Sequence, residues 1–262
     1  MSAELIARAA VVPMCAQPSL RSEQVSQLVL GETATVLERD GMWRRARAAL
    51  DCYDGWVHTG YVVEADAPSA ERWLREATGW SGGAVVRAGE EVVRLPLRAR
   101  VVLEDSAVRL PDGRRGRVQQ GRVTTMDEAV AEARARPPER WALDAFAGTP
   151  YAWGGVTPAG VDCSGLVQTT FLARGVRLPR DAAQQADCGA PVAIGAWRPG
   201  DLLFFRGDET DRITHVAFAA EDETLIHSTV ACGGVLQEPW GPGTRAASLR
   251  QRLVAVRRVE QR

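Results

Sequence analysis

Lysine is missing from this sequence, because all 32 basic residues are arginines. A Schiff base or a lysine nucleophile is therefore excluded as a catalytic device. An excess of charge of one sign is missing too, since 33 acidic residues leave a formal net charge of −1. Nucleic acids and anionic membranes select strongly basic surfaces. We therefore expect neither as a partner.

Paired cysteines and long apolar runs are also absent. The five cysteines are scattered and contain no Cys-x-x-Cys pair, which argues against a disulfide framework and a zinc ribbon. No apolar run approaches the ~20 residues of a membrane-spanning helix. Glu4 and Arg8 interrupt the stretch where a signal peptide needs a cationic and then an apolar run. We expect a cytoplasmic protein, or an exported one if the true start lies upstream.

The first part of the chain is rich in short β-forming runs. The 262 residues, 45% of them apolar, are enough for two or three domains. Strands are expected at 25–30, 34–38, 43–46 and 55–58, and their spacing indicates a small barrel. Residues 65–69 read as a linker, and residues 71–78 as a short helix. More strands follow between 84 and 118 around a hairpin turn at 111–116, which indicates a second barrel.

The last part of the chain has helices first and strands afterwards. Helices are expected at 125–136 and 139–147, and strands at 201–205, 214–219, 224–228 and 252–257. Helices followed by a run of antiparallel strands are typical of an α+β domain. The sequence thus predicts three domains, at 1–66, 67–124 and 125–262.

Cys163 lies at the start of a further predicted helix. Asp162 is a good N-cap and Gly175 a good residue after the helix end. The apolar residues between them fall on one helical face, which predicts an amphipathic helix. Backbone N–H groups and the helix dipole at this position favour a thiolate. Cys163 is therefore either an activated nucleophile or a small buried residue.

Two of the three histidines follow Cys163 on neighbouring predicted strands. His215 and His227 come after it in the chain, whereas His58 belongs to the first barrel. Nucleophilic cysteine catalysis needs a thiolate, an imidazole that carries the proton, and a third polar group that orients the imidazole. The same three residues could bind a metal, but no fourth ligand recurs at a ligand spacing, so we expect no metal.

Six motifs follow one another between residues of about 140 and 260. They are Tyr151-x-Trp153-Gly-Gly155, Asp162-Cys163-Ser164-Gly165, Leu178-Pro179-Arg180-Asp181, Pro199-Gly200-Asp201-Leu202 with Phe204-Phe205, His215-Val216 and Ile226-His227. In this order they resemble the NlpC-type cell-wall peptidases, a papain-like cysteine peptidase family. With two SH3-like barrels in front, the chain is similar to the dipeptidyl-peptidase VI (γ-D-glutamyl-L-diamino acid endopeptidase) subgroup.

The resemblance implies an α+β papain-like catalytic domain and a catalytic role for four residues. Cys163 would be the nucleophile, His215 the general base and acid, and His227 the orienting residue. Tyr151 would contribute to the oxyanion hole together with the Cys163 backbone N–H. No cofactor is implied. The bond cut would be that between D-Glu and the diamino acid of murein peptides with a free N-terminal L-Ala, as in peptidoglycan recycling.

The resemblance also implies which residues bind the substrate. Asp162, Ser164 and Asp181 would hold the ammonium group of the substrate, since a buried ammonium needs a carboxylate partner. Glu23 and Tyr53 of the first barrel would narrow the groove. Asp162 and Asp181 also have a simpler interpretation as helix caps.

Other functions fit the same sequence. One is a wall-remodelling hydrolase that acts on intact murein stems, and another is a catalytically inert wall-binding module. A third is acyl transfer or amidase action on a different γ-glutamyl compound. For all of them we expect a monomer.

Overall fold

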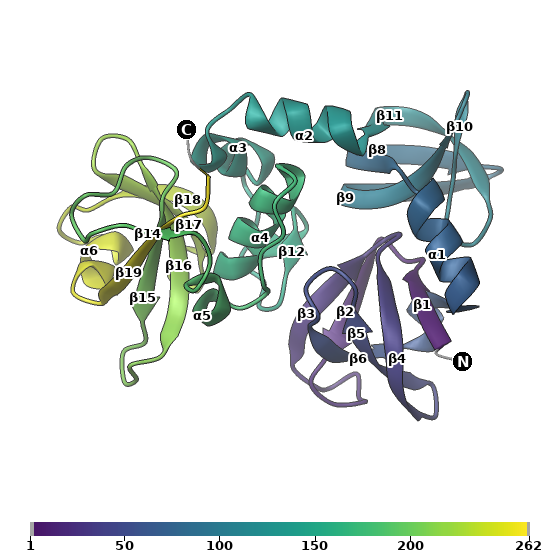
Figure 1. Ribbon diagram of the computed structural model, residues 1–262, viewed down its shortest axis with the longest axis horizontal. Coiled ribbons are helices and arrows are strands. Elements are labelled where there is room, and N and C mark those ends of the chain that lie inside the picture. Colours follow the sequence, from purple (N-terminus) through teal and green to yellow (C-terminus); the bar gives the residue numbers. More distant parts are fainter. Residues whose placement is uncertain (1–2, 261–262) are drawn as a thin grey trace. The chain divides into compact units, whose positions relative to one another are not determined.

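The computed structural model describes residues 3–260 and divides the chain into two compact units, up to Ala131 and from Glu132 onward (Figure 1). Among residues 3–260, no helix has both the length and the apolar character needed to cross a membrane.

The first unit begins with a seven-stranded antiparallel sheet in the order β3-β2-β6-β5-β4-β1-β7. The strands expected at 25–30, 34–38, 43–46 and 55–58 are confirmed as β3, β4, β5 and β6, whereas β1, β2 and β7 were not predicted. Alternate residues of the strands build one buried core that includes Leu5, Met14 and Val57. The strands are β1 (Ala3–Ala7), β2 (Val11–Cys15), β3 (Gln24–Val29), β4 (Thr33–Asp40), β5 (Trp43–Ala48), β6 (Asp54–His58) and β7 (Val62–Asp66).

A helix and a closed four-stranded barrel complete this unit. The linker expected at 65–69 is wrong, because β7 runs to Asp66 and helix α1 starts at the next residue. The carboxylate of Asp66 accepts a hydrogen bond from the backbone N–H of Ser69 at 2.9 Å and so caps the helix. The elements are α1 (Ala67–Glu76), β8 (Gly79–Ala88), β9 (Glu91–Glu104), β10 (Ala107–Arg109) and β11 (Arg115–Thr125).

Buried polar contacts join the sheet to the barrel within the first unit. Arg98 of β9 pairs with Glu32, which precedes β4, at 2.6 Å, and both side chains are almost fully buried. The indole N–H of Trp73 donates to the carbonyl of Gly31 at 2.8 Å. Two β-rich regions therefore form one unit.

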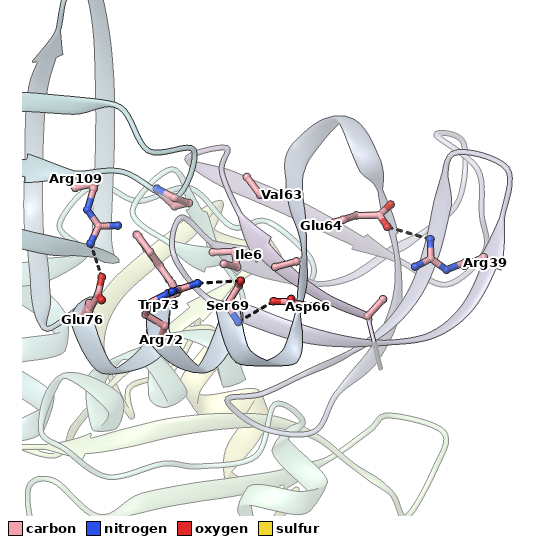
Figure 2. Close-up of a pocket in the computed structure, with 13 residues that line it drawn as sticks. Ile6, Arg39, Val63, Glu64, Asp66, Ser69, Arg72, Trp73, Glu76 and Arg109 are labelled. Carbon is pink, nitrogen blue, oxygen red and sulfur yellow. Dashed lines mark hydrogen bonds and ion pairs between the residues drawn. The ribbon is translucent and has the colours of Figure 1, made fainter. Parts of the chain in front are cut away.

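A pocket of about 770 Å³ in the first unit is lined by residues of β1, β4, β7 and α1, by Arg109 at the end of β10 and by Pro111 after it (Figure 2). Arg39 pairs with Glu64 at its rim, and Arg109 pairs with Glu76. Its conspicuous charges are thus paired within the chain, and we assign it no ligand.

The second unit is the α+β domain. The helices expected at 125–136 and 139–147 are confirmed as α2 (Met126–Arg134), which crosses the boundary between the units after Ala131, and α3 (Pro138–Ala145), which lies in the second unit. Thr125 and Glu128 form a reciprocal cap at the start of α2. The remaining helices are α4 (Cys163–Ala173), α5 (Ala182–Gln185) and α6 (Arg245–Arg250).

A six-stranded antiparallel sheet, in the order β14-β19-β15-β16-β17-β18, forms the centre of this unit. The four expected strands are confirmed as β15, β16, β17 and β19, but β14, β18 and α6 were not predicted. The strands are β14 (Ala190–Pro191), β15 (Leu202–Arg206), β16 (Ile213–Ala220), β17 (Thr224–Thr229), β18 (Gly234–Pro239) and β19 (Leu253–Arg258), with the small hairpin of β12 (Val156–Thr157) and β13 (Gly160–Val161) beside them.

Helices cover both faces of this sheet, with α4 on one side and α6 on the other (Figure 1). Phe171 of α4 lies against Phe218 of β16, their ring centroids 5.9 Å apart. On the opposite face Ala246 and Leu249 of α6 pack with Phe205 in a separate buried cluster. Helix α4 also packs against β16, and the backbone N–H of Val216 in that strand contacts Cys163 at the start of α4, where the candidate site lies.

Candidate active site

The helix that carries Cys163 starts and ends as predicted. Asp162 has extended backbone angles, and its side chain accepts from the Gly165 N–H at 2.7 Å. Gly175 has φ 77° and follows the helix end. The expected amphipathic character is wrong, because every residue of α4 except Leu172 is buried. The reason is that α3, β12, β16 and β17 surround the helix.

Gly165 allows the loop before the helix to lie directly against it. A Cβ atom at Gly165 would be 2.1 Å from the carbonyl oxygen of Gly155. The Gly155 carbonyl also accepts from the Asp162 N–H at 3.2 Å. The glycines of the two motifs are therefore needed for close packing that places residues 151–155 beside Cys163.

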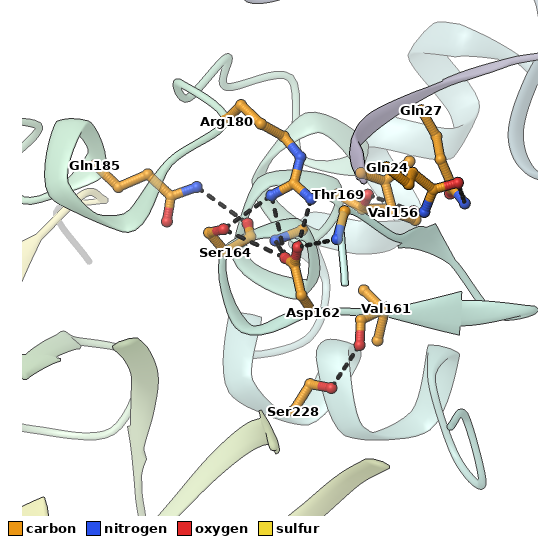
Figure 3. A network of polar contacts seen from close by, with 12 residues as sticks. Gln24, Gln27, Val156, Val161, Asp162, Ser164, Thr169, Arg180, Gln185 and Ser228 are labelled. Atoms are coloured by element: carbon orange, nitrogen blue, oxygen red, sulfur yellow. Dashed lines mark hydrogen bonds and ion pairs between the residues drawn. The ribbon is translucent and has the colours of Figure 1, made fainter. Parts of the chain in front are cut away.

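A buried network joins Asp162 and Ser164, which precede and follow Cys163 in the chain, to Arg180 (Figure 3). Arg180 donates to both carboxylate oxygens of Asp162, at 3.1 and 2.5 Å, and to the Ser164 hydroxyl at 2.8 Å. The N–H of Gly154 also donates to Asp162, at 2.9 Å. Burial opposes the charge of Arg180, but Asp162 holds the pKa of its guanidinium above the usual value. The carboxylate of Asp162 is thus neutralised and saturated with donors.

Cys163 is a buried thiol, 7% exposed. Burial raises the pKa of the Cys163 thiol to about 12, and the negative charge of Asp162 acts in the same direction. Hydrogen bonds from the backbone N–H groups of Val216 and Ser164 lower this pKa. The expected stabilisation of a thiolate by the helix start is thus outweighed by desolvation in the free protein. The contact with Val216 places the sulfur next to the residue that follows His215.

His215 and His227 lie side by side on β16 and β17. The Nε2 atom of His215 is 2.9 Å from the Nδ1 atom of His227, and the rings meet edge to face. Burial lowers the pKa of His215 well below its ordinary value, and His227 adds to this effect. Burial also lowers the pKa of His227, to about 4. Both imidazoles are therefore neutral at neutral pH.

Glu238 is a residue of this site that the sequence analysis missed. Its carboxylate is 6% exposed, and its Oε2 atom lies 3.4 Å from Nε2 of His227. It precedes a run rich in proline and glycine, residues 239–243, which gave no sign of the strand that ends there.

Tyr151 lies on the other side of the thiol. It forms an isolated bridge with Val161, and its N–H donates to the carbonyl of Gly233 at 2.9 Å. Burial raises the pKa of its phenol, and the charges of Cys163 and Asp162 raise it further, so the hydroxyl is protonated and close to both groups.

The remaining predicted substrate residues are distributed over both units. Asp181 is exposed just before α5 and makes no side-chain cap of that helix. Glu23 and Tyr53 belong to the first unit, where they precede β3 and β6. Both strands flank the end of β2 at Cys15, so these residues share one end of the sheet. Across residues 3–260, no group of three or more His, Cys, Asp or Glu could hold a metal ion.

Two family models match this chain. The NlpC/P60 family model matches residues 148–252, and the bacterial dipeptidyl-peptidase Sh3 domain model matches residues 14–60. The first range contains the whole site around Cys163, His215 and His227.

Curated relatives match the same C-terminal region. A γ-D-glutamyl-L-lysine dipeptidyl-peptidase of Bacillus subtilis (strain 168) is 42% identical over 84 residues, which cover 32% of this chain and 28% of the relative. A probable endopeptidase of Haemophilus influenzae is 41% identical over 92 residues, 35% of this chain and 56% of the relative. The chain thus spans less than two thirds of the length of these relatives.

Solved structures share the fold over nearly the whole chain. An NlpC/P60 family protein from Bacillus cereus has a TM-score of 0.80 at 19% identity, covering 98% of this chain and 99% of that one. An NlpC/P60 endopeptidase from Photobacterium damselae subsp. piscicida has a TM-score of 0.68 at 15% identity, covering 96% and 70%. The chain therefore contains an NlpC/P60 domain with a papain-like α+β fold, preceded by a β-rich region that includes a bacterial dipeptidyl-peptidase SH3 domain.

Proposed function

We propose that this protein is a cysteine endopeptidase that hydrolyses the bond between γ-D-Glu and the diamino acid of murein peptides with a free N-terminal L-Ala. The observation that carries the proposal is the placement of Cys163 at the start of α4, beside a strand whose His215 contacts His227 at 2.9 Å. These are the parts of a nucleophile, base and orienting group.

The reaction starts from a neutral thiol and a neutral imidazole. Because burial raises the pKa of Cys163 and lowers that of His215, a separated thiolate and imidazolium are disfavoured in the free protein. The sulfur attacks the amide carbon as its proton passes to His215. His215 then returns the proton to the leaving amine, and water later releases the acyl group from the sulfur.

The developing oxyanion would be held at the start of α4. The first N–H groups of a helix have no partner within the helix, and the N–H of Cys163 is one of them. The protonated hydroxyl of Tyr151 is near the sulfur and would be a second donor.

The names of the relatives support the substrate class. The Bacillus relatives are γ-D-glutamyl-L-lysine dipeptidyl-peptidases, and a dipeptidyl-peptidase releases two residues from a free amino end. We carry this specificity to the present chain as part of the proposal, with a diamino acid following the cleaved bond.

We further propose that Asp181 contributes the negative charge that attracts the substrate ammonium. Asp162 is paired with Arg180, so the Asp162–Ser164–Arg180 group offers hydrogen bonds and no net charge. Asp181 follows Arg180 directly in the chain, and its side chain is exposed. Asp181→Asn should raise KM for a free-amine substrate, whereas Asp187→Asn, an exposed aspartate just after α5, should not.

Cleavage of defined peptides tests the function. The protein is incubated with L-Ala-γ-D-Glu-L-Lys and L-Ala-γ-D-Glu-diaminopimelate, and products are identified by mass spectrometry. Release of L-Ala-D-Glu is expected from the native protein and not from a folded Cys163→Ala variant. N-acetylation of L-Ala should block turnover. Activity that persists in Cys163→Ala would refute the proposal.

A wall-remodelling hydrolase is the second candidate, favoured by relatives named as probable endopeptidases in Haemophilus influenzae and Escherichia coli. Equal cleavage of free and N-capped stems would replace the first proposal by this one.

A further inference from the structure

Glu238 lies close to Nε2 of His227, whereas Nδ1 of the same ring faces His215. In the pairing of β17 with β18, His227 lies opposite Leu236 and Leu225 opposite Glu238. His227 and Glu238 are therefore diagonal neighbours on one face of the sheet. Nε2 of His227 and Oε2 of Glu238 are 3.4 Å apart, and both side chains are buried.

The carboxylate of Glu238 is held in place by the start of α6. Its Oε1 accepts from the N–H of Arg245 and its Oε2 from the N–H of Ala246, each at 2.7 Å. These two N–H groups are among those that a helix leaves without internal partners. Both oxygens of the Glu238 carboxyl group therefore act as hydrogen-bond acceptors at this position.

This geometry selects the tautomer of both histidines. Nε2 of His227 makes no hydrogen bond within residues 3–260, and Oε2 of Glu238 lies 3.4 Å from it. An unprotonated Nε2 would place its lone pair near the carboxylate oxygens, whereas a protonated one would place an N–H there. Nδ1 of His227 is then the acceptor, so Nε2 of His215 must donate across the 2.9 Å contact. Nδ1 of His215 is left with a lone pair, which is the group that can take the proton of Cys163.

We propose that Glu238 is a positioning residue of this peptidase, which through His227 fixes His215 as the tautomer with a basic Nδ1. This inference rests on the proposed function. Glu238 touches neither the sulfur nor the substrate in this scheme, and it acts by biasing where two protons reside. It links the start of α6 to the catalytic site as a fourth member of the chain Cys163, His215, His227, Glu238.

The tautomer can be measured without any substrate. Two-bond ¹H–¹⁵N spectra distinguish protonated from unprotonated ring nitrogens, and the chain has three histidines. His58 is an internal standard, because its Nδ1 accepts from the Gly60 N–H at 3.1 Å and its proton therefore resides on Nε2. In the native protein we expect His215 and His227 to show the same tautomer as His58. A proton on Nδ1 of His227 would overturn the proposal.

Glu238→Gln should change the tautomer, since its amide can donate to Nε2 of His227. We expect loss of the uniform His227 tautomer and a fall in kcat of about ten- to a hundred-fold, with KM within about twofold. The matched control is Thr244→Ala, which removes the other cap of α6, the 3.0 Å bond from Ala247 N–H to the Thr244 hydroxyl. It should destabilise α6 similarly but leave the tautomers and kcat unchanged.

The outcomes separate this proposal from the proposed function. Equal losses of kcat in Glu238→Gln and Thr244→Ala would show a merely structural role and refute positioning. If the native protein cleaves no murein peptide, the proposed function fails, while the native spectrum still decides the tautomer. If Glu238→Gln does not fold, the same native spectrum remains decisive.

Discussion

Removing Arg180 should destabilise the catalytic unit more than removing any exposed arginine. Arg180 is 1% exposed and donates hydrogen bonds to both carboxylate oxygens of Asp162 and to the Ser164 hydroxyl. Arg180→Met keeps a similar length and apolar stem but leaves the Asp162 charge buried without its cation. Breaking a buried ion pair in this way costs about 3–5 kcal/mol. Because the N–H groups of Gly154 and Gly165 still contact Asp162, we expect the free energy of unfolding to fall by about 3 kcal/mol, at the lower end of this range.

Calorimetry measures this loss, since the second unit should melt about 10 °C lower while the transition of the first unit does not move. Arg140→Met is the matched control in the same unit. Arg140 pairs with Glu221 at 3.0 Å, but both side chains are well exposed, so its loss should cost about 1 kcal/mol or less.

A second substitution checks the cause. Asp162→Asn in the Arg180→Met background removes the unpaired charge and keeps a good N-cap, so it should recover part of the lost stability. If Arg180→Met lowers the melting temperature no more than Arg140→Met, the reasoning about the buried pair is refuted.

Three further predictions concern packing and pH. Gly165→Ala should abolish cleavage and expose Cys163 to thiol reagents, because the added Cβ would lie 2.1 Å from the carbonyl oxygen of Gly155. Normal activity of this variant would contradict the close contact between the two segments. The acid limb of kcat/KM should lie below pH 6.5, since burial lowers the pKa of His215, and a midpoint at pH 7 or above would contradict this. The pKa of His227 is lowered to about 4 from 6.5, so the unfolded state binds more protons between these values. The contribution of His227 to the free energy of unfolding should be fully present above pH 6.5 and fall by about 3 kcal/mol towards pH 4. Urea unfolding measures this loss of stability, which should be smaller in His227→Gln.

Several features of the site could be predicted from local sequence because their physical cause is local. An N-cap and a following glycine determine where α4 starts and ends, and both lie within the helix and its flanks. The alternation and turns of the strands from β15 to β17 are equally local, which is why His215 and His227 were placed on neighbouring strands. Their roles remain predictions.

Other features were predicted wrongly because neighbours far away in the sequence decide them. The apolar face of α4 suggested an exposed opposite side, but strands and helices cover the whole helix. The helix start suggested a thiolate, yet burial raises the pKa of Cys163 to about 12. Burial depends on tertiary packing, and no local pattern reports it.

The sequence by itself predicted many of the strands and helices, the chemical types at the site and the family resemblance of the C-terminal half. Only the tertiary structure showed that Arg180 neutralises Asp162 and that Glu238 stands behind His227. Asp162 and Arg180 are 18 positions apart in the chain, and His227 and Glu238 are 11 positions apart. Charge pairing and proton placement depend on distances of a few ångströms, and the packing of strands and helices sets those distances.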